Sequence, residues 1–168
     1  YTSYSITLVT TSGATATYPT RDKYWDEGDL VRVTGSGDSI QVKRLSSSSL
    51  SGSFNSDATK LGDYTLADNV EILDTYDDTT AIRVYPNRLS GVKLKSDAVR
   101  FYSTNEQGEI DRLILEDVTG DMHSYGVLTS AKEINAGMTL MGNYTLDLAG
   151  TSIPLVTTNT VYSVHKGA

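Results

Sequence analysis

Apolar and polar residues alternate along most of this chain, in short runs that are broken by turn-forming residues. Three pairs of such runs, each joined by a polar, glycine-containing turn, span residues 4–18, 30–45 and 99–115. An extended run of this kind buries every second side chain, as a strand with one face in a core does. No long stretch shows the period of about 3.6 residues that an amphipathic helix requires. The sequence therefore predicts an all-β fold of small antiparallel barrels or sandwiches, built from consecutive hairpins with little helix.

One stretch interrupts the alternation. Residues 46–56 (SSSSLSGSFNS) carry only two large apolar side chains, Leu50 and Phe54, among small polar ones. Such a low-complexity segment offers little apolar surface to offset the conformational entropy that ordering removes. We expect an exposed loop here, attached to the barrel surface at most by Leu50 and Phe54.

The start of the chain is similar to a segment near its end. Residues 4–8 (YSITL) match residues 144–148 (YTLDL) in pattern, 140 positions later, and a threonine-containing return strand follows each. A repeated hairpin predicts two related β units. We expect a β-module over residues 1–121, entered partway through the unit. Residues 122–168 are expected to be the first part of a second β unit, which packs on the first or pairs with it.

The amino-acid composition indicates a cellular location and excludes some classes of binding partner. The chain has no cysteine, and its 14 basic and 21 acidic residues give a net charge of −7. Nucleic acids and anionic membrane surfaces attract clustered lysine and arginine, so we expect neither as a partner. The apolar runs are far shorter than the roughly 20 residues that cross a bilayer, so we expect no membrane insertion. An acidic, cysteine-free chain rich in serine and threonine suits an exported bacterial protein.

Several motifs resemble one family. Residues 122–131 (MHSYGVLTSA) and 144–146 (YTL) are similar to the opening strands of β-rich repeat modules in bacterial surface proteins that also carry S-layer homology (SLH) domains. Residues 27–33, 64–70 and 98–102 resemble later strands of the same module. No SLH motif occurs in the chain itself. The resemblance implies a secreted protein of the bacterial cell surface or cell wall, with neighbouring domains of the same protein as partners and no catalytic residues.

The residues able to carry out acid–base chemistry form no catalytic motif. The chain has two histidines, His123 and His165, and no G-x-S-x-G segment. Few other side chains change charge near neutral pH without a large pKa shift. We therefore expect no enzyme activity, and a role as a structural spacer or interaction unit.

An aromatic and acidic segment keeps a carbohydrate-binding module open as the alternative. Tyr24 and Trp25 are followed closely by Asp26 and Asp29. Aromatic faces stack on sugar rings, and carboxylates accept hydrogen bonds from sugar hydroxyls. These four residues are the candidate ligand-binding residues, with cell-wall or environmental glycans as the ligands.

Three aspartates form the candidate metal site. Asp74, Asp77 and Asp78 lie close together in the sequence. Calcium takes about six to eight oxygen ligands, which a cluster of carboxylates can begin to supply. We expect no cofactor, with weak calcium binding at these three residues as the open alternative.

Overall fold

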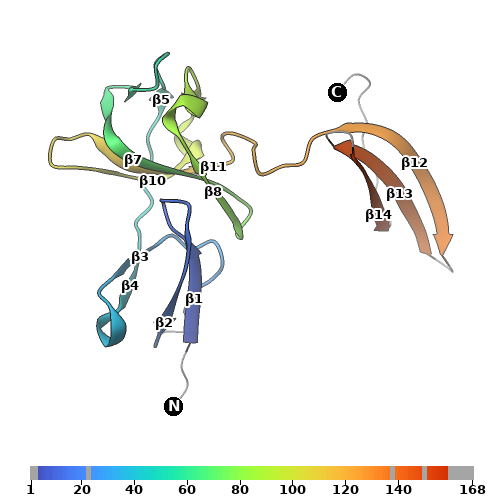
Figure 1. Cartoon of the computed structure of the whole chain (residues 1–168), viewed down its shortest axis with the longest axis horizontal. Helices are drawn as coiled ribbons and strands as arrows, with labels where there is room; N and C mark the ends of the chain where they lie inside the picture. The colour runs from blue at the N-terminus through green and yellow to red at the C-terminus, as the bar shows by residue number, and fades with distance from the viewer. Residues whose placement is uncertain (1–3, 22–23, 137–138, 149–150, 159–168) are drawn as a thin grey trace. The chain divides into compact units, whose positions relative to one another are not determined.

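The computed structural model describes the backbone of residues 4–21, 24–136, 139–148 and 151–158, and the side chains of this part up to Lys132. The chain divides into two compact units, unit 1 (Tyr1–Met122) and unit 2 (His123–Ala168). The described parts of both units consist of strands, with three short 3-10 turns in unit 1 (Figure 1). The prediction of an all-β fold is confirmed.

Unit 1 begins with two antiparallel hairpins. β1 (Tyr4–Val9) pairs with β2 (Thr15–Thr20), and β3 (Val31–Thr34) pairs with β4 (Gln41–Arg44) through a turn that contains η1 (Gly37–Ser39). Along β2 and β3, half-buried and exposed side chains alternate, as the sequence pattern requires. Both hairpins follow the residue ranges that the sequence predicts.

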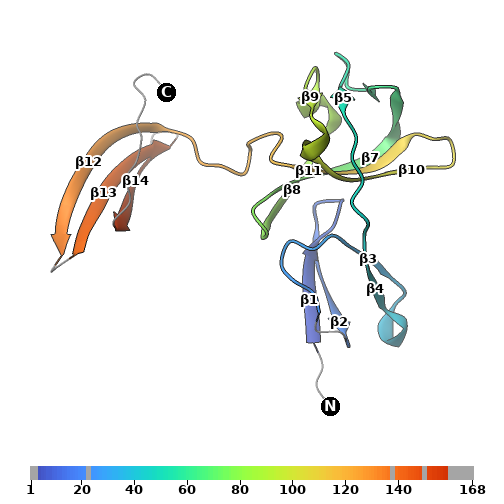
Figure 2. The same ribbon diagram turned by 180° about the vertical axis from the view of Figure 1, so that it is seen from behind.

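The larger sheet of unit 1 is organised around one long central strand, β7 (Tyr64–Tyr76). It pairs antiparallel with β6 (Lys60–Leu61) and β8 (Thr80–Val84), and parallel with β11 (Ile110–Glu116). β11 also forms the predicted hairpin with β10 (Val99–Thr104). The remaining elements are the β5 (Gly52–Ser53) and β9 (Lys93–Leu94) pair, η2 (Pro86–Leu89) and η3 (Ser96–Ala98). Together the strands form a curled, half-barrel sheet, which Figure 2 shows from behind.

The parallel pairing of β7 with β11 is a departure from the expected antiparallel arrangement. The register runs from Arg112 opposite Glu71 to Glu116 opposite Thr75. Parallel neighbours need a long connection, and here β8, β9 and β10 provide it. Because its two strands are far apart in sequence, this pairing leaves no local pattern that reveals it.

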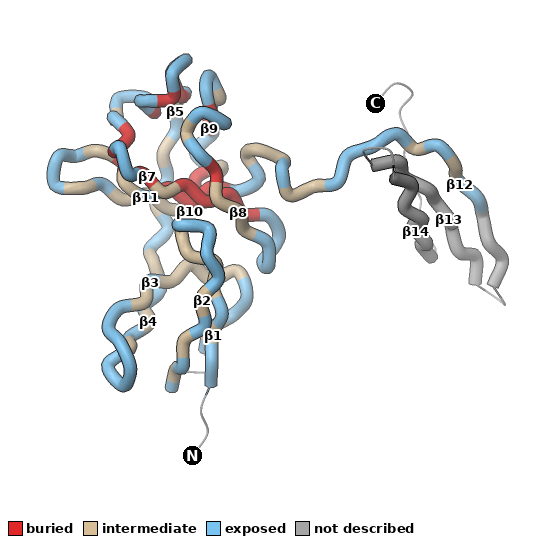
Figure 3. Tube along the Cα trace, viewed as in Figure 1, coloured by how far each residue is buried: buried red, intermediate tan, exposed pale blue. Residues whose placement is uncertain are grey.

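The core of unit 1 lies among β5 to β11. Its buried apolar cluster consists of Phe54, Leu61, Leu66, Val70, Ile72, Val84, Leu89, Leu94, Val99, Ile110, Leu113 and Leu115. Figure 3 shows the buried positions in this region, whereas the described residues of β1 to β4 are half-buried or exposed. The described residues of the two N-terminal hairpins therefore form no fully buried core of their own.

The prediction of an exposed loop over residues 46–56 is wrong for the second half of this segment. β5 forms within it, and Phe54 is only 2% exposed at the centre of the core. Leu50 packs against the same cluster. Ser48 is also fixed, because its Oγ accepts the Tyr102 N–H at 3.0 Å. One buried phenylalanine supplies enough apolar contact to order a segment whose other side chains are small and polar.

Unit 2 is a three-stranded antiparallel sheet with β13 at its centre. Its strands are β12 (Val127–Ala136), β13 (Thr139–Leu148) and β14 (Thr151–Thr158).

Across the described residues of both units, no helix combines the length and apolar character needed to cross a membrane.

Candidate functional site

A hollow of about 510 Å³ lies beside β1 in unit 1. Residues 5–9 of β1 line it, together with residues 25–31, residues 77–81 and Arg100 of β10. The hollow thus gathers most of the residues that the sequence singled out for ligand or metal binding: Trp25, Asp26, Asp29, Asp77 and Asp78.

Arg100 connects the 25–31 segment to the sheet. Its Nη2 donates to the Gly28 carbonyl oxygen at 2.7 Å, and its Nη1 donates to Thr75 Oγ1 at 3.0 Å. Gly28 has a φ of +94°, and a Cβ at this position would lie 2.6 Å from Asp78 Oδ1. Only glycine allows this close approach, so Gly28 and Arg100 together determine how near the two acidic segments lie.

Trp25 is held by Arg44. The Arg44 guanidinium lies over the Trp25 ring, 5.4 Å from its centroid, and donates to Asp29 Oδ1 at 2.9 Å. Asp29 Oδ2 also accepts the Asp26 N–H at 2.9 Å. One face of the indole and the Asp29 carboxylate are therefore already engaged within the protein. Among the described residues, the buried Trp25 Nε1 has no hydrogen-bond partner.

Tyr24 is the predicted ligand residue that the hollow leaves out. Its side chain is 74% exposed and does not line the cavity, although its neighbour Trp25 does. The structure therefore does not combine Tyr24 and Trp25 into one stacking surface inside the hollow.

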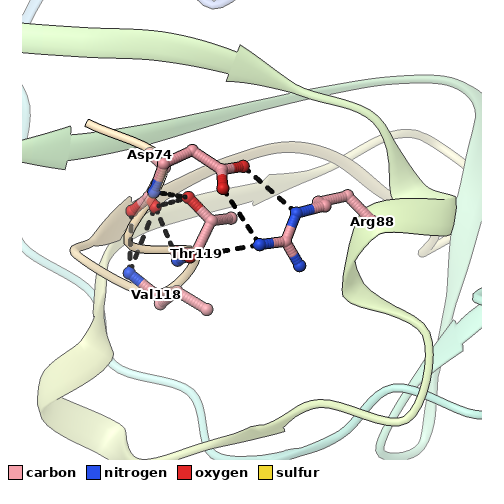
Figure 4. Close-up of polar contacts among 5 residues, drawn as sticks. Asp74, Arg88, Val118 and Thr119 are labelled. Carbon is pink, nitrogen blue, oxygen red and sulfur yellow. Dashed lines mark hydrogen bonds and ion pairs between the residues drawn. The ribbon is translucent and has the colours of Figure 1, made fainter. Parts of the chain in front are cut away.

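Asp74 does not join Asp77 and Asp78. Its buried carboxylate accepts hydrogen bonds from Thr119 N at 2.8 Å, Thr119 Oγ1 at 2.7 Å and Val118 N at 3.0 Å (Figure 4). Asp77 lies in the turn after β7, where its own Oδ1 accepts the Asp78 N–H at 2.7 Å. Within the part of the chain that the structure describes, no three acidic, histidine or cysteine side chains are grouped to hold a metal ion. The three predicted metal ligands are thus not brought together.

A second set of polar contacts holds the segment of Val118 and Thr119 that binds Asp74. Arg88 Nε and Nη2 donate to the two Asp121 carboxylate oxygens at 3.1 and 3.0 Å, and Nη2 also donates to the Thr119 carbonyl oxygen at 3.2 Å (Figure 4). These bonds lower the pKa of the Asp121 carboxyl. Sequence reasoning missed this anchor because Arg88 and Asp121 are 33 residues apart. The carboxyl side chain of Asp74 directly after Ile72 and Leu73 was a usable signal, since a buried polar group needs hydrogen-bond partners.

The groups in the hollow that can exchange protons are mainly carboxylates. Its lining includes acidic side chains, hydroxyls and Arg100, but neither histidine nor cysteine. The ring of His123 instead contacts the Tyr125 ring edge-on, with centroids 6.2 Å apart. His165 lies outside the described residues.

Strand register relates the first hairpin to unit 2. Pro19 of β2 stands opposite Ser5, and Pro154 of β14 stands opposite Thr145. Thr145 is the residue that matches Ser5 when the chain is shifted by 140 positions. The similarity of residues 4–8 to 144–148 therefore extends to the return strands, which carry a proline at the same place in the ladder.

The strands and their pairing place the chain in the all-β class of proteins. Comparison with family models, with curated proteins and with solved structures finds no match for the chain.

Proposed function

We propose that this chain is a non-catalytic, extracellular β-module of a bacterial cell-surface protein of the S-layer type. It acts as a structural spacer or as an interaction unit with neighbouring domains of the same protein. The observation that carries the proposal is the repeated hairpin, with proline opposite Ser5 in one copy and opposite Thr145 in the other. Repetition of a strand unit is typical of modular arrays, in which each copy stacks on its neighbour.

The compartment follows from the resemblance to SLH-associated modules. Residues 122–131 and 144–146 carry it, and both fall in the region where unit 2 begins and forms its central strand. The absence of cysteine and the net charge of −7 agree with an exported, highly soluble chain. Secretion to the cell surface or cell wall is therefore part of the proposal.

The end of unit 1 is built in a way that suits a spacer. Asp74 of β7 and Arg88 of η2 bind residues 118–121, close to the end of unit 1. We expect tension applied at this end of unit 1 to act on β7 through these bonds before the segment detaches. Hydrogen-bonded ladders then share the tension among several bonds.

Incubation with purified bacterial sacculi tests the proposal. Soluble muropeptides and reducing sugars are measured after incubation, alongside the amount of chain that sediments with the sacculi. We expect no release of fragments above the level of a heat-denatured control. Release that the His123→Ala substitution abolishes would overturn the non-catalytic assignment.

Carbohydrate binding is the second candidate, because the buried Trp25 Nε1 lacks a partner among the described residues of a site that also holds Asp26. Trp25 is the only tryptophan of the chain, so its fluorescence reports on the hollow. A saturable fluorescence change with cell-wall oligosaccharides, lost in Asp26→Asn, would favour this candidate. If no oligosaccharide changes the Trp25 fluorescence, carbohydrate binding at the hollow is excluded and the spacer role remains.

A further inference from the structure

We infer that one exposed face of the β3–β4 hairpin is a binding site for the phosphate groups of a phosphodiester polymer of the cell wall. The inference names a ligand for the interaction unit and in that respect rests on the proposed function. It concerns the charges on a single hairpin, which substitutions can reverse one at a time.

The face carries two basic side chains directly opposite each other. Arg32 of β3 stands opposite Lys43 of β4 in the antiparallel register, and both residues are exposed (Figure 1). Residues directly opposite each other point to the same face of a sheet, with Cβ atoms about 4.5–5.5 Å apart. The guanidinium of Arg32 and the ammonium of Lys43 therefore lie on one side of the hairpin.

This pairing is unfavourable in the free protein. Like charges directly opposite each other destabilise a sheet, whereas opposite charges at the same position stabilise it. Neither Arg32 nor Lys43 forms an ion pair with a carboxylate of the described residues, although the chain has 21 acidic residues. A bound anion removes the repulsion, so a ligand compensates for the cost of this arrangement.

The other arginines of the chain differ from Arg32. Those within ion-pair distance of a carboxylate are Arg44, Arg83, Arg88, Arg100 and Arg112. Within the described part of the chain, Arg21 and Arg32 have no such partner. Lys43 connects the two, because it stands opposite Arg32 and lines a hollow of about 530 Å³ together with Arg21. The unpaired cations are thus gathered at one hairpin.

Neutral hydrogen-bonding groups continue the same face. The next pair on this side of the hairpin is Thr34 opposite Gln41, and both residues are exposed. They lie about 7 Å further along the strands, since each strand residue advances by about 3.4 Å. Gln41 also lines the hollow that Lys43 and Arg21 share. The face offers two cations and, next to them, a hydroxyl and an amide.

A phosphodiester group matches this pair of cations. Its two charged oxygens diverge from a tetrahedral phosphorus, so one oxygen accepts from Arg32 while the other accepts from Lys43. Both side chains are common ligands of phosphate, arginine as a fork of donors and lysine as a point charge. Hydroxyl groups of the polyol or sugar between successive phosphates match Thr34 and Gln41. An extended polymer therefore fits the order of groups along the hairpin.

The site is local because the chain as a whole is acidic. Its net charge of −7 repels a polyanion at a distance. Binding therefore depends on the contacts at this face rather than on overall attraction. Contacts between cations and phosphates weaken as salt is added, because counterions are no longer released on binding at low cost. We expect binding that falls with salt and depends strongly on single side chains.

Sedimentation of the full chain with purified sacculi tests the ligand. Hydrofluoric acid hydrolyses phosphodiester bonds and so removes these polymers, whereas the glycan strands and the carboxylates of the wall remain. We expect the chain to sediment with untreated sacculi and to bind treated sacculi about tenfold more weakly, because charged hydrogen bonds are lost. Inorganic polyphosphate should compete with untreated sacculi, and neutral dextran should not.

Charge reversal at Lys43 gives the matched test on the protein. Lys43→Glu should weaken binding to untreated sacculi about tenfold or more. It should also raise the urea concentration at the midpoint of unfolding, because opposite charges across β3 and β4 attract each other. Lys93→Glu is the control, since it changes the net charge equally at an exposed position of β9 and should leave binding nearly unchanged. Loss of binding together with a gain in stability separates a ligand contact from a structural role.

Three outcomes would overturn the inference. They are no sedimentation with untreated sacculi, equal binding to treated and untreated sacculi, and equal binding by Lys43→Glu and Lys93→Glu. If Lys43→Glu fails to fold, Arg32→Gln replaces it in the same comparison. The release of cell-wall fragments decides the non-catalytic assignment in a separate measurement, so the inference and the proposed function fail separately.

Discussion

Replacing Asp74 by alanine would leave two main-chain N–H groups and one hydroxyl of the 118–119 segment without their acceptor. An unsatisfied buried donor costs about 1–3 kcal/mol. We expect Asp74→Ala to lower the free energy of unfolding by about 3 kcal/mol or more, as measured by urea denaturation. The exposed Asp78→Asn is the control and should change it by less than about 0.5 kcal/mol. Similar small losses in both variants would show that Asp74 is no anchor.

The ion pair beside it makes a prediction about pH. Hydrogen bonding from Arg88 is the largest cause of the lowered pKa of Asp121. A carboxyl whose pKa is lower in the folded state stabilises the fold above its ordinary pKa, and this contribution is lost as the pH falls through the lowered value. In Arg88→Gln we expect Asp121 to titrate closer to the ordinary range, followed by carboxyl carbon NMR shifts. An unchanged titration curve would assign the shift to other groups.

At the scale of elements, β5 depends on the side chain that follows it. Phe54 is buried among the core residues, although it ends a serine-rich stretch. Large-to-small substitutions of buried aromatic residues cost about 3–5 kcal/mol. We expect Phe54→Ala to lower the free energy of unfolding by this amount in urea denaturation, and the exposed Ser49→Ala to have little effect. If Phe54→Ala lowers the free energy of unfolding by less than about 1 kcal/mol, the segment behaves as an exposed loop and Phe54 is not a core residue.

The docking of the first hairpin on the sheet rests on its turn. Gly13 has a φ of +91°, and a Cβ there would lie 2.6 Å from the Cβ of Arg83 in β8. Thr11 Oγ1 in the same turn donates to Glu71 Oε1 of β7 at 2.8 Å. We expect Gly13→Ala to accelerate hydrogen exchange of β1 and β2 amides, because the turn must move off the sheet. Gly108→Ala is the control, since its φ is also positive but open space surrounds it. Equal acceleration in β1 and β2 by both variants would show that the contact is unimportant.

The sequence predicts those elements whose signal is local. The hairpins at residues 4–18, 30–45 and 99–115 follow from alternation and from the turns that join them. The parallel β7–β11 ladder joins strands that are distant in the chain, so no neighbouring residues encode it. Phe54 was missed for a related reason, because the composition around it describes a loop while its own burial depends on strands formed elsewhere.

The candidate site was predictable only in pieces. Trp25, Asp26 and Asp29 were chosen for one kind of ligand and Asp77 and Asp78 for another, yet a single hollow contains both sets. Their meeting depends on Arg100 and Gly28, which draw distant segments together. Neither contact has a signature in the local sequence.

At the scale of the whole molecule, one strand arrangement occurs twice. The hairpin of β1 and β2 and the pair of β13 and β14 share a register, with a proline opposite Ser5 in the first and opposite Thr145 in the second. Such a repeat supports the proposal of a modular array.

The central proposal is that this chain acts as a structural spacer or interaction unit, by transmitting force or contact rather than by chemistry. The most direct test is force spectroscopy on single chains that are held by their two ends. The account predicts an abrupt release of the length stored in unit 1, recovery of the fold on relaxation, and a lower release force in Asp74→Ala because the end of the unit is then unfastened. Smooth extension along the curve of an unfolded polymer, with no abrupt release, would contradict it.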